Sequence, residues 1–153
     1  MPMFRQSLPQ NAWHRAFSGA SSDITAAASW IESVASELGL SDPQAFAMQV
    51  CIEELMSNIV RHGDASSTSW PRDARNSLCI SITVKALDDR ITMTVEDNAS
   101  PFNVVQAPAK VIDQALEKVQ PGGLGIHLIK SFASNLQYSR TDTGNQVVVE
   151  IMG

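Results

Sequence analysis

The chain has 153 residues, of which 44% are hydrophobic and 18% charged, and its formal net charge at pH 7 is −5. This length and composition predict one globular domain over residues 1–153. The negative charge, with lysine and arginine scattered along the chain, argues against a basic nucleic-acid surface and against binding to an acidic membrane. No leader-like pattern and no membrane-spanning apolar run is present, so we expect a cytoplasmic protein.

The first part of the chain predicts a short strand and then a helix. The strand is expected at residues 12–17. The helix is expected at 24–38, with N-caps offered by residues 21–23 and a stop at Gly39. We expect both cysteines to be small core residues in a reducing compartment: Cys51 and Cys79.

A second helix, expected at residues 44–63, carries the most informative pattern. At about 100° per residue its apolar positions form one stripe: Met48, Ile52, Leu55, Met56 and Ile59. Glu54 and Asn58 lie one turn apart on the flank of this stripe, so we expect them to be partly buried. Buried polar groups need partners, which the protein or a ligand supplies. The alternative is an ordinary i, i+4 pair on an amphipathic helix.

A polar loop is expected at residues 64–76, followed by two alternating runs that predict an antiparallel hairpin, 78–84 and 91–95. Continuing the second alternation puts Asp97 on the face of the buried residues Ile91, Met93 and Val95. A carboxylate on a buried face indicates a binding role. The alternative is an aspartate that only ends the strand.

The last third opens with a mixed segment that includes a predicted short helix at 110–119. It is followed by glycines that begin a helix, Gly122-Gly123-Leu124-Gly125, and by two strands at 136–141 and 146–152. The glycines do not match the P-loop, which needs lysine directly after its last glycine. A glycine-rich helix start favours an anion such as phosphate, and the alternative is a flexible turn.

The order of these elements predicts an α+β fold. The strands cluster as hairpins and the helices fall between them. We therefore expect a two-layer α/β sandwich with a mixed, mostly antiparallel sheet and helices on one face.

Three stretches together resemble the GHKL ATPase superfamily, whose fold is the histidine-kinase-like (Bergerat) ATPase fold. Glu54-Leu-Met-Ser-Asn58 resembles its N box, Asp97-Asn98-Ala99-Ser100-Pro101-Phe102 its first glycine box, and Gly122-Gly123-Leu124-Gly125-Ile126 its second. Arg-His-Gly after the N box and the ending Thr-Gly-Asn are most similar to the anti-sigma-factor serine kinases of the RsbW type. Ala99 departs from the usual glycine, and the threonine of the last box is not clearly present.

The resemblance implies that the cofactors are ATP and Mg²⁺. Asn58 would hold Mg²⁺, Asp97 would accept a hydrogen bond from adenine, and residues 103–121 would form the ATP lid. Glu54 would be the general base, because Glu53 points to the polar side of the helix. The residues expected to contact the cofactor are Asn58, Asp97, Ala99, Gly122, Gly123, Leu124, Gly125 and Ile126.

The function implied by the resemblance is that of an ATP-dependent serine-protein kinase and anti-sigma factor. It would phosphorylate a STAS-domain anti-sigma-factor antagonist and sequester a sigma factor, and the resemblance suggests a homodimer. One alternative is a protein-binding module gated by ATP, without phosphate transfer. Another is a detached histidine-kinase catalytic domain, although no helical hairpin with an acceptor histidine precedes the expected domain.

Overall fold

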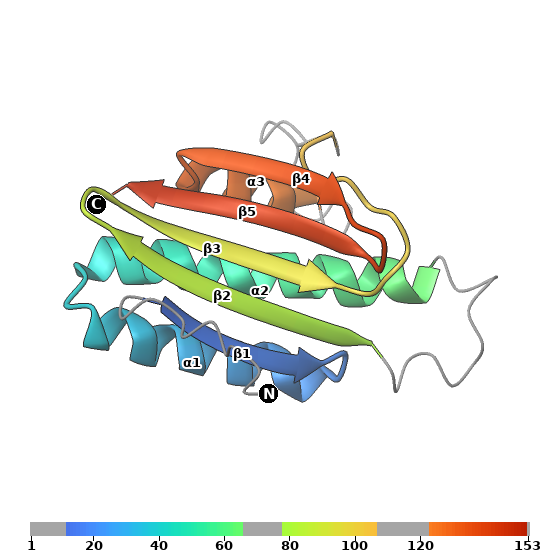
Figure 1. Cartoon of the computed structure of the whole chain (residues 1–153), viewed down its shortest axis with the longest axis horizontal. Coiled ribbons are helices and arrows are strands. Elements are labelled where there is room, and N and C mark those ends of the chain that lie inside the picture. The colour runs from blue at the N-terminus through green and yellow to red at the C-terminus, as the bar shows by residue number, and fades with distance from the viewer. Residues whose placement is uncertain (1–11, 66–77, 107–122, 153) are drawn as a thin grey trace, which may run out of the picture.

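A five-stranded antiparallel sheet and three helices form the part of the chain that the computed structural model describes, residues 12–65, 78–106 and 123–152. The elements follow the order β1 (Ala12–Ser18), α1 (Ser21–Glu37), α2 (Asp42–Ala65), β2 (Cys79–Leu87), β3 (Arg90–Asp97), α3 (Gly123–Phe132), β4 (Asn135–Arg140) and β5 (Asn145–Met152). The strand order is β1-β2-β3-β5-β4, and every neighbouring pair is antiparallel (Figure 1).

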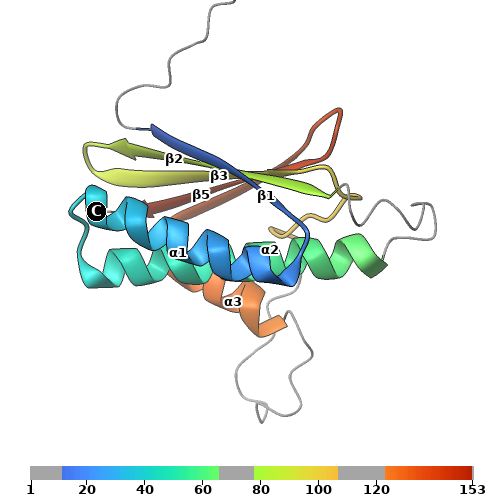
Figure 2. The ribbon, with the colours of Figure 1, turned by 90° about the horizontal axis from the view of Figure 1, so that it is seen from below.

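The helices lie on one face of the sheet, as Figure 2 shows from the side. The inward faces of β2, β3 and β5 carry the expected alternating apolar residues, which pack against α2 between α1 and α3. The predicted two-layer α+β sandwich is therefore confirmed. Among the described helices, none is both long and apolar enough to cross a bilayer.

Helix α1 ends as predicted but begins differently. Gly39 has a φ of 66°, and the Gly39 and Leu40 amides donate to the carbonyls of Ser36 and Ala35, which is a Schellman motif. At the start, Ser21 and Ser22 already lie in the helix, and Ala20 makes no side-chain cap. The carboxylate of Asp23 instead accepts hydrogen bonds from the backbone amide and hydroxyl of Ser18.

Helix α2 is the central element, and all five residues of its predicted stripe are buried. It runs past the predicted end at Gly63 to Ala65. Gly63 has helical backbone and so does not act as a left-handed cap. The first two residues of the predicted polar loop, 64 and 65, are therefore helical. Residues 66–77 lie outside the described residues, as do the helix predicted at 110–119 and Gly122.

The register of the sheet puts two polar side chains next to each other. Asp97 ends β3 on its inward face, as predicted, and is paired with Asn145 at the start of β5. The same alternation corrects the prediction for Cys79. Ile80 and Ile82 point inward, so Cys79 points outward and is exposed, while Cys51 is buried as expected.

Candidate functional site

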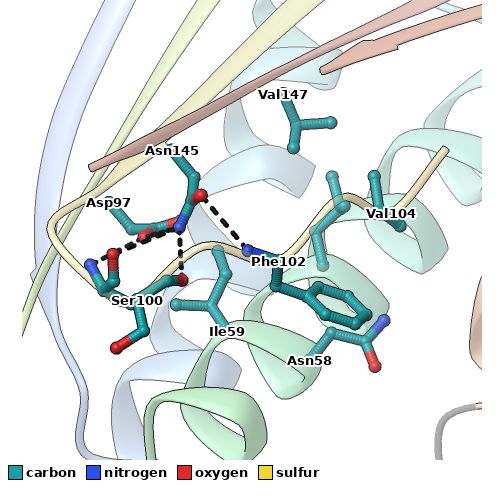
Figure 3. Close-up of a pocket in the computed structure, with 10 residues that line it drawn as sticks. Asn58, Ile59, Asp97, Ser100, Phe102, Val104, Asn145 and Val147 are labelled. Carbon is teal, nitrogen blue, oxygen red and sulfur yellow. Dashed lines mark hydrogen bonds between the residues drawn. The ribbon is translucent and has the colours of Figure 1, made fainter. Parts of the chain in front are cut away.

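A small cavity lies between α2 and the end of the sheet where β3 stops and β5 starts (Figure 3). Its volume is about 20 Å³, room for about one water molecule. The lining is mostly apolar, with two buried polar groups from the sheet and one from the helix. It consists of Leu55, Asn58, Ile59, Asp97, Ala99, Ser100, Phe102, Val104, Asn145 and Val147.

Asp97 is 8% exposed, and hydrogen bonds fix one of its two oxygens. Its Oδ1 accepts from the Ala99 backbone amide and from Asn145 Nδ2, both at 2.9 Å. Its Oδ2 accepts no hydrogen bond from the described residues. Burial raises the pKa of Asp97, and the two hydrogen bonds and the charge of Arg140 oppose that rise. The carboxylate is thus held in place with one free acceptor.

Asn145 holds the turn that follows β3. Besides Asp97, its Nδ2 donates to the Ser100 carbonyl at 3.0 Å. Its Oδ1 accepts from the Tyr138 hydroxyl at 2.5 Å and from the Phe102 backbone amide at 3.4 Å. All four polar sites of this buried amide are therefore used or shared, as a buried polar group requires.

Arg140 on β4 supports the same turn. Its Nη1 donates to the Ala99 carbonyl at 2.7 Å and to Asn145 Oδ1 at 3.3 Å. Ala99 itself is only 5% exposed and packs into the core. Alanine in place of the usual glycine is accommodated because the turn makes inward contacts with the methyl group and needs no positive φ.

Glycine is required at position 144 because the backbone there passes very close to the turn that follows β3. A Cβ atom on Gly144 would overlap the Asp97 carbonyl oxygen and lie 2.8 Å from the Asn98 Cα. Tyr138 and Arg140, which also contact this turn or its Asn145, were missed as site residues. Gly144 and Asn145 stood only within the quoted Thr-Gly-Asn stretch, and the register of β5 against β3 identifies the role of Asn145.

Asn58 on α2 is the second buried polar group of the cavity, and it is not satisfied. It is 2% exposed. Its Oδ1 accepts a hydrogen bond from Arg61 Nη1 at 3.2 Å. Its Nδ2 is buried and has no hydrogen-bond partner among the described residues. An unsatisfied buried donor in a cavity wall indicates a ligand that accepts a hydrogen bond there.

Glu54, one turn before Asn58, is half-buried and lies against the start of α3. A Cβ on Gly125 would overlap its Oε2 and lie 2.9 Å from its Cδ, so only glycine leaves room for the carboxylate. Burial raises the pKa of Glu54, the neighbouring Glu53 raises it further, and the Arg61 guanidinium opposes both. Glu53 is exposed, in keeping with the choice of Glu54 over its neighbour.

The second glycine-rich stretch forms the first turns of α3. Gly123, Leu124, Gly125 and Ile126 lie in this helix, which packs against α2. Ile126 is buried in the core. The helix N-terminus therefore lies beside the polar flank of α2, where backbone amides favour an anion. Of the predicted lid, residues 103–106 are described, and Val104 closes one side of the cavity.

Comparison with known proteins identifies the family. A family model described as the histidine kinase-like ATPase domain matches residues 17–151. The chain belongs to this family. The predicted histidine-kinase-like (GHKL) ATPase family is thereby confirmed, and membership implies an ATP-binding domain.

Two known proteins are similar to this chain, one in sequence and one in fold. It is 27% identical over 120 residues to the serine/threonine-protein kinase BtrW of Bordetella bronchiseptica, covering 78% of this chain and 79% of that protein. It also matches a crystal structure of the RsbU and RsbW domains of Rv1364c from Mycobacterium tuberculosis. That match covers 94% of this chain, with a TM-score of 0.63 and 14% identity, and the chain spans 32% of that longer protein.

The residues of the site fit ATP and Mg²⁺. Asp97 offers one free carboxylate oxygen at the cavity. Asn58 offers an amide oxygen, which now accepts from Arg61, and a buried nitrogen that could donate to a phosphate oxygen. Within the described ranges, no group of three or more His, Cys, Asp or Glu side chains is arranged to hold a metal. Mg²⁺ does not need such a group, because it commonly keeps its waters and takes one or two protein ligands besides substrate phosphates.

Proposed function

We propose that this protein is an ATP-dependent serine-protein kinase of the anti-sigma-factor type, with residues 1–153 forming one domain. The observation that carries the proposal is the position of Glu54. Its carboxylate is half-buried against Gly125 at the start of α3, one helical turn from Asn58. The similarity to a protein named as a serine/threonine kinase supports the same activity.

The end of the site that holds the cavity, beside Asp97, would bind the adenine base of ATP. Asp97 Oδ2 would accept a hydrogen bond from the exocyclic amino group of adenine, while Oδ1 would keep its hydrogen bonds from Ala99 and Asn145. The apolar walls from Ile59 and Val147 contact the ring faces. A cavity of about 20 Å³ is far too small for adenine, so Phe102 and Val104 have to move outward for the base to enter.

The other end of the site, where Glu54 and Asn58 lie near the start of α3, would bind the phosphates. When bound, ATP supplies the phosphoryl group and Mg²⁺ neutralises its charge. Asn58 would be the protein ligand for the metal, and the backbone amides that begin α3 would bind the phosphate oxygens. Ile126 anchors that helix in the core. Glu54, from the adjacent turn of α2, accepts the proton of the incoming serine hydroxyl.

The raised pKa of Glu54 suits a general base. Its half-buried carboxylate is a stronger base than an exposed one, because burial disfavours the ionised form. The charge of the Arg61 guanidinium opposes this rise in the pKa of Glu54. The expected partners are a STAS-domain antagonist that provides the serine and a sigma factor that the kinase sequesters, with the kinase acting as a homodimer in the cytoplasm.

Phosphate transfer from γ-labelled ATP to candidate STAS-domain proteins tests the proposal. Wild type should label a serine of the partner, and Glu54→Ala should bind ATP normally but label it at least about 100-fold more slowly. Glu53→Ala is the matched control, since its side chain is exposed on the next residue of the same helix. Equal rates for wild type and Glu54→Ala would remove Glu54 as the base.

The same experiment separates the kinase from a binding module. If no partner is labelled although titration shows ATP binding, the kinase activity is wrong. ATP would then act as a ligand that gates a protein-binding surface.

A further inference from the structure

Arg61 contacts the polar side of α2 that faces the site. It follows Asn58 by three residues and Glu54 by seven, so the three side chains lie along one side of the helix. Arg61 Nη1 donates to Asn58 Oδ1 at 3.2 Å, and its charge acts on the Glu54 carboxylate. Arg61 itself is exposed, so this guanidinium can move without disturbing the core.

The hydrogen bond from Arg61 decides which way the Asn58 amide faces. The amide oxygen can accept from the guanidinium, whereas the amide nitrogen turned to the same place would set two donors against each other. With Oδ1 facing Arg61, Nδ2 is left buried without a partner. The orientation that satisfies Arg61 is therefore the one that leaves the buried donor of Asn58 unsatisfied.

Mg²⁺ requires the atom that Arg61 holds. The ion takes oxygen ligands, so only Oδ1 of Asn58 can bind it. If the ion approaches Oδ1 from the side of Arg61, two cations meet at one oxygen and repel each other. If the amide turns to present Oδ1 elsewhere, its hydrogen bond with Arg61 is broken. An ion on the second lone pair of Oδ1 would lie close to the guanidinium and meet the same repulsion, so each route weakens the contact between Arg61 and Asn58.

We propose that Arg61 is a positioning residue that holds the Asn58 amide in the nucleotide-free protein and has to leave it when Mg²⁺ binds. Arg61 thereby sets the Mg²⁺ concentration at which nucleotide binds. The inference rests on the proposed role of Asn58 as the metal ligand, and it does not depend on the serine kinase activity.

The test is a Mg²⁺ titration of the binding of a fluorescent, non-hydrolysable ATP analogue to the full chain. Wild type is compared with Arg61→Ala, Arg61→Lys and Arg90→Ala. Arg90 lies at the opposite end of β3 from Asp97, so its loss changes the net charge equally, far from the cavity. We expect the Mg²⁺ midpoint to fall about fivefold in Arg61→Ala, as for the loss of one exposed charge-assisted hydrogen bond. The Mg²⁺ midpoint of Arg61→Lys should lie between those of wild type and Arg61→Ala, and the midpoint of Arg90→Ala should equal that of wild type.

Two outcomes would overturn the proposal. An unchanged midpoint in Arg61→Ala would leave Arg61 a structural residue, visible only as a lower unfolding temperature. A higher midpoint, or weaker analogue binding in EDTA, would mean that the guanidinium binds phosphate directly. This experiment measures nucleotide binding and not phosphate transfer. If the kinase proposal fails because no serine is labelled, the comparison of Mg²⁺ midpoints can still be made.

Discussion

The two ends of the candidate site differ in how completely their polar groups are satisfied. At the sheet end, Asp97 and Asn145 bond to each other and to the turn after β3, and Tyr138 and Arg140 complete the network. At the helix end, Asn58 has a buried nitrogen without a partner in the described residues. A half-buried Glu54 there has no hydrogen bond from them either.

The difference distinguishes polar groups whose positions are already fixed by hydrogen bonds from polar groups that lack partners until a ligand binds. A buried network in which each member has its partners is rigid and keeps one geometry. Unsatisfied buried groups raise the free energy of the folded chain until a ligand satisfies them. In the proposed function, the sheet end would therefore present the free Oδ2 of Asp97 to the base in a fixed position. The helix end would gain its missing interactions only when metal and phosphates bind.

The strongest test of the helix end is Gly125→Ala. The added methyl group overlaps Glu54 Oε2, so the carboxylate has to leave its place. We expect phosphate transfer to the acceptor identified with wild type to fall about 100- to 10,000-fold, the usual contribution of a general base. In a Glu54→Ala background the same change should add little further loss. Independent, additive losses in this double-mutant cycle would show that the two residues do not act together.

The sheet end is tested by Asn145→Ala, which leaves Asp97, Ser100 and the Tyr138 hydroxyl without their common partner. We expect the free energy of unfolding, measured by urea denaturation, to fall by about 2–4 kcal/mol. Gln146→Ala on the outer face of the same strand is the control and should cost less than about 1 kcal/mol. Equal costs for the two variants would mean that the network does not stabilise the fold.

Asn58→Ala should show the opposite pattern, with a large effect on binding and a small one on folding. We expect Mg²⁺-dependent ATP affinity, measured by calorimetry, to fall about 100-fold, at the upper end of the loss when a metal site loses support. The free energy of unfolding should change by less than about 1 kcal/mol, because the loss of the hydrogen bond from the exposed Arg61 is offset by removal of an unsatisfied buried nitrogen. Gln49→Ala, nine residues earlier on α2, is the control.

The smallest expected effect concerns pH. The pKa of Asp97 is higher in the folded chain than in the unfolded chain, so the folded state binds this proton more tightly. Between the ordinary pKa of 3.8 and the raised value, stability should therefore decrease as pH rises. Asp97→Asn should remove this part of the pH dependence and also weaken ATP binding. An identical pH profile of the unfolding free energy in wild type and variant would contradict the burial of the charge.

The sequence located the residues whose signals are local. Helical spacing placed Glu54 and Asn58 beside the apolar stripe, and alternation placed Asp97 on the buried face. The family resemblance then joined these positions into one site. It did not identify Arg61 as a partner of Asn58, because that contact depends on a side-chain conformation.

Such local patterns do not predict contacts between strands that are far apart in the sequence. Asn145 and Arg140 reach the Asp97 turn through pairings of β5 with β3 and β4. The pairing of β4 with β5 is a local hairpin, but nothing local specifies the register of β5 against β3, which joins Asn145 to Asp97. The prediction that Cys79 lies in the core was wrong. It gave more weight to the hydrophobic character of cysteine than to the strand alternation, which points this side chain outward.

The small cavity beside Asp97 has a consequence for the speed of nucleotide association. Since Phe102 and Val104 close a space of about 20 Å³, an entering base needs a form of the protein in which they have moved away. If that form is rare in the free protein, the observed association rate will level off at high nucleotide concentration. The plateau would then measure how often this wall opens, independently of how tightly the bound nucleotide is held.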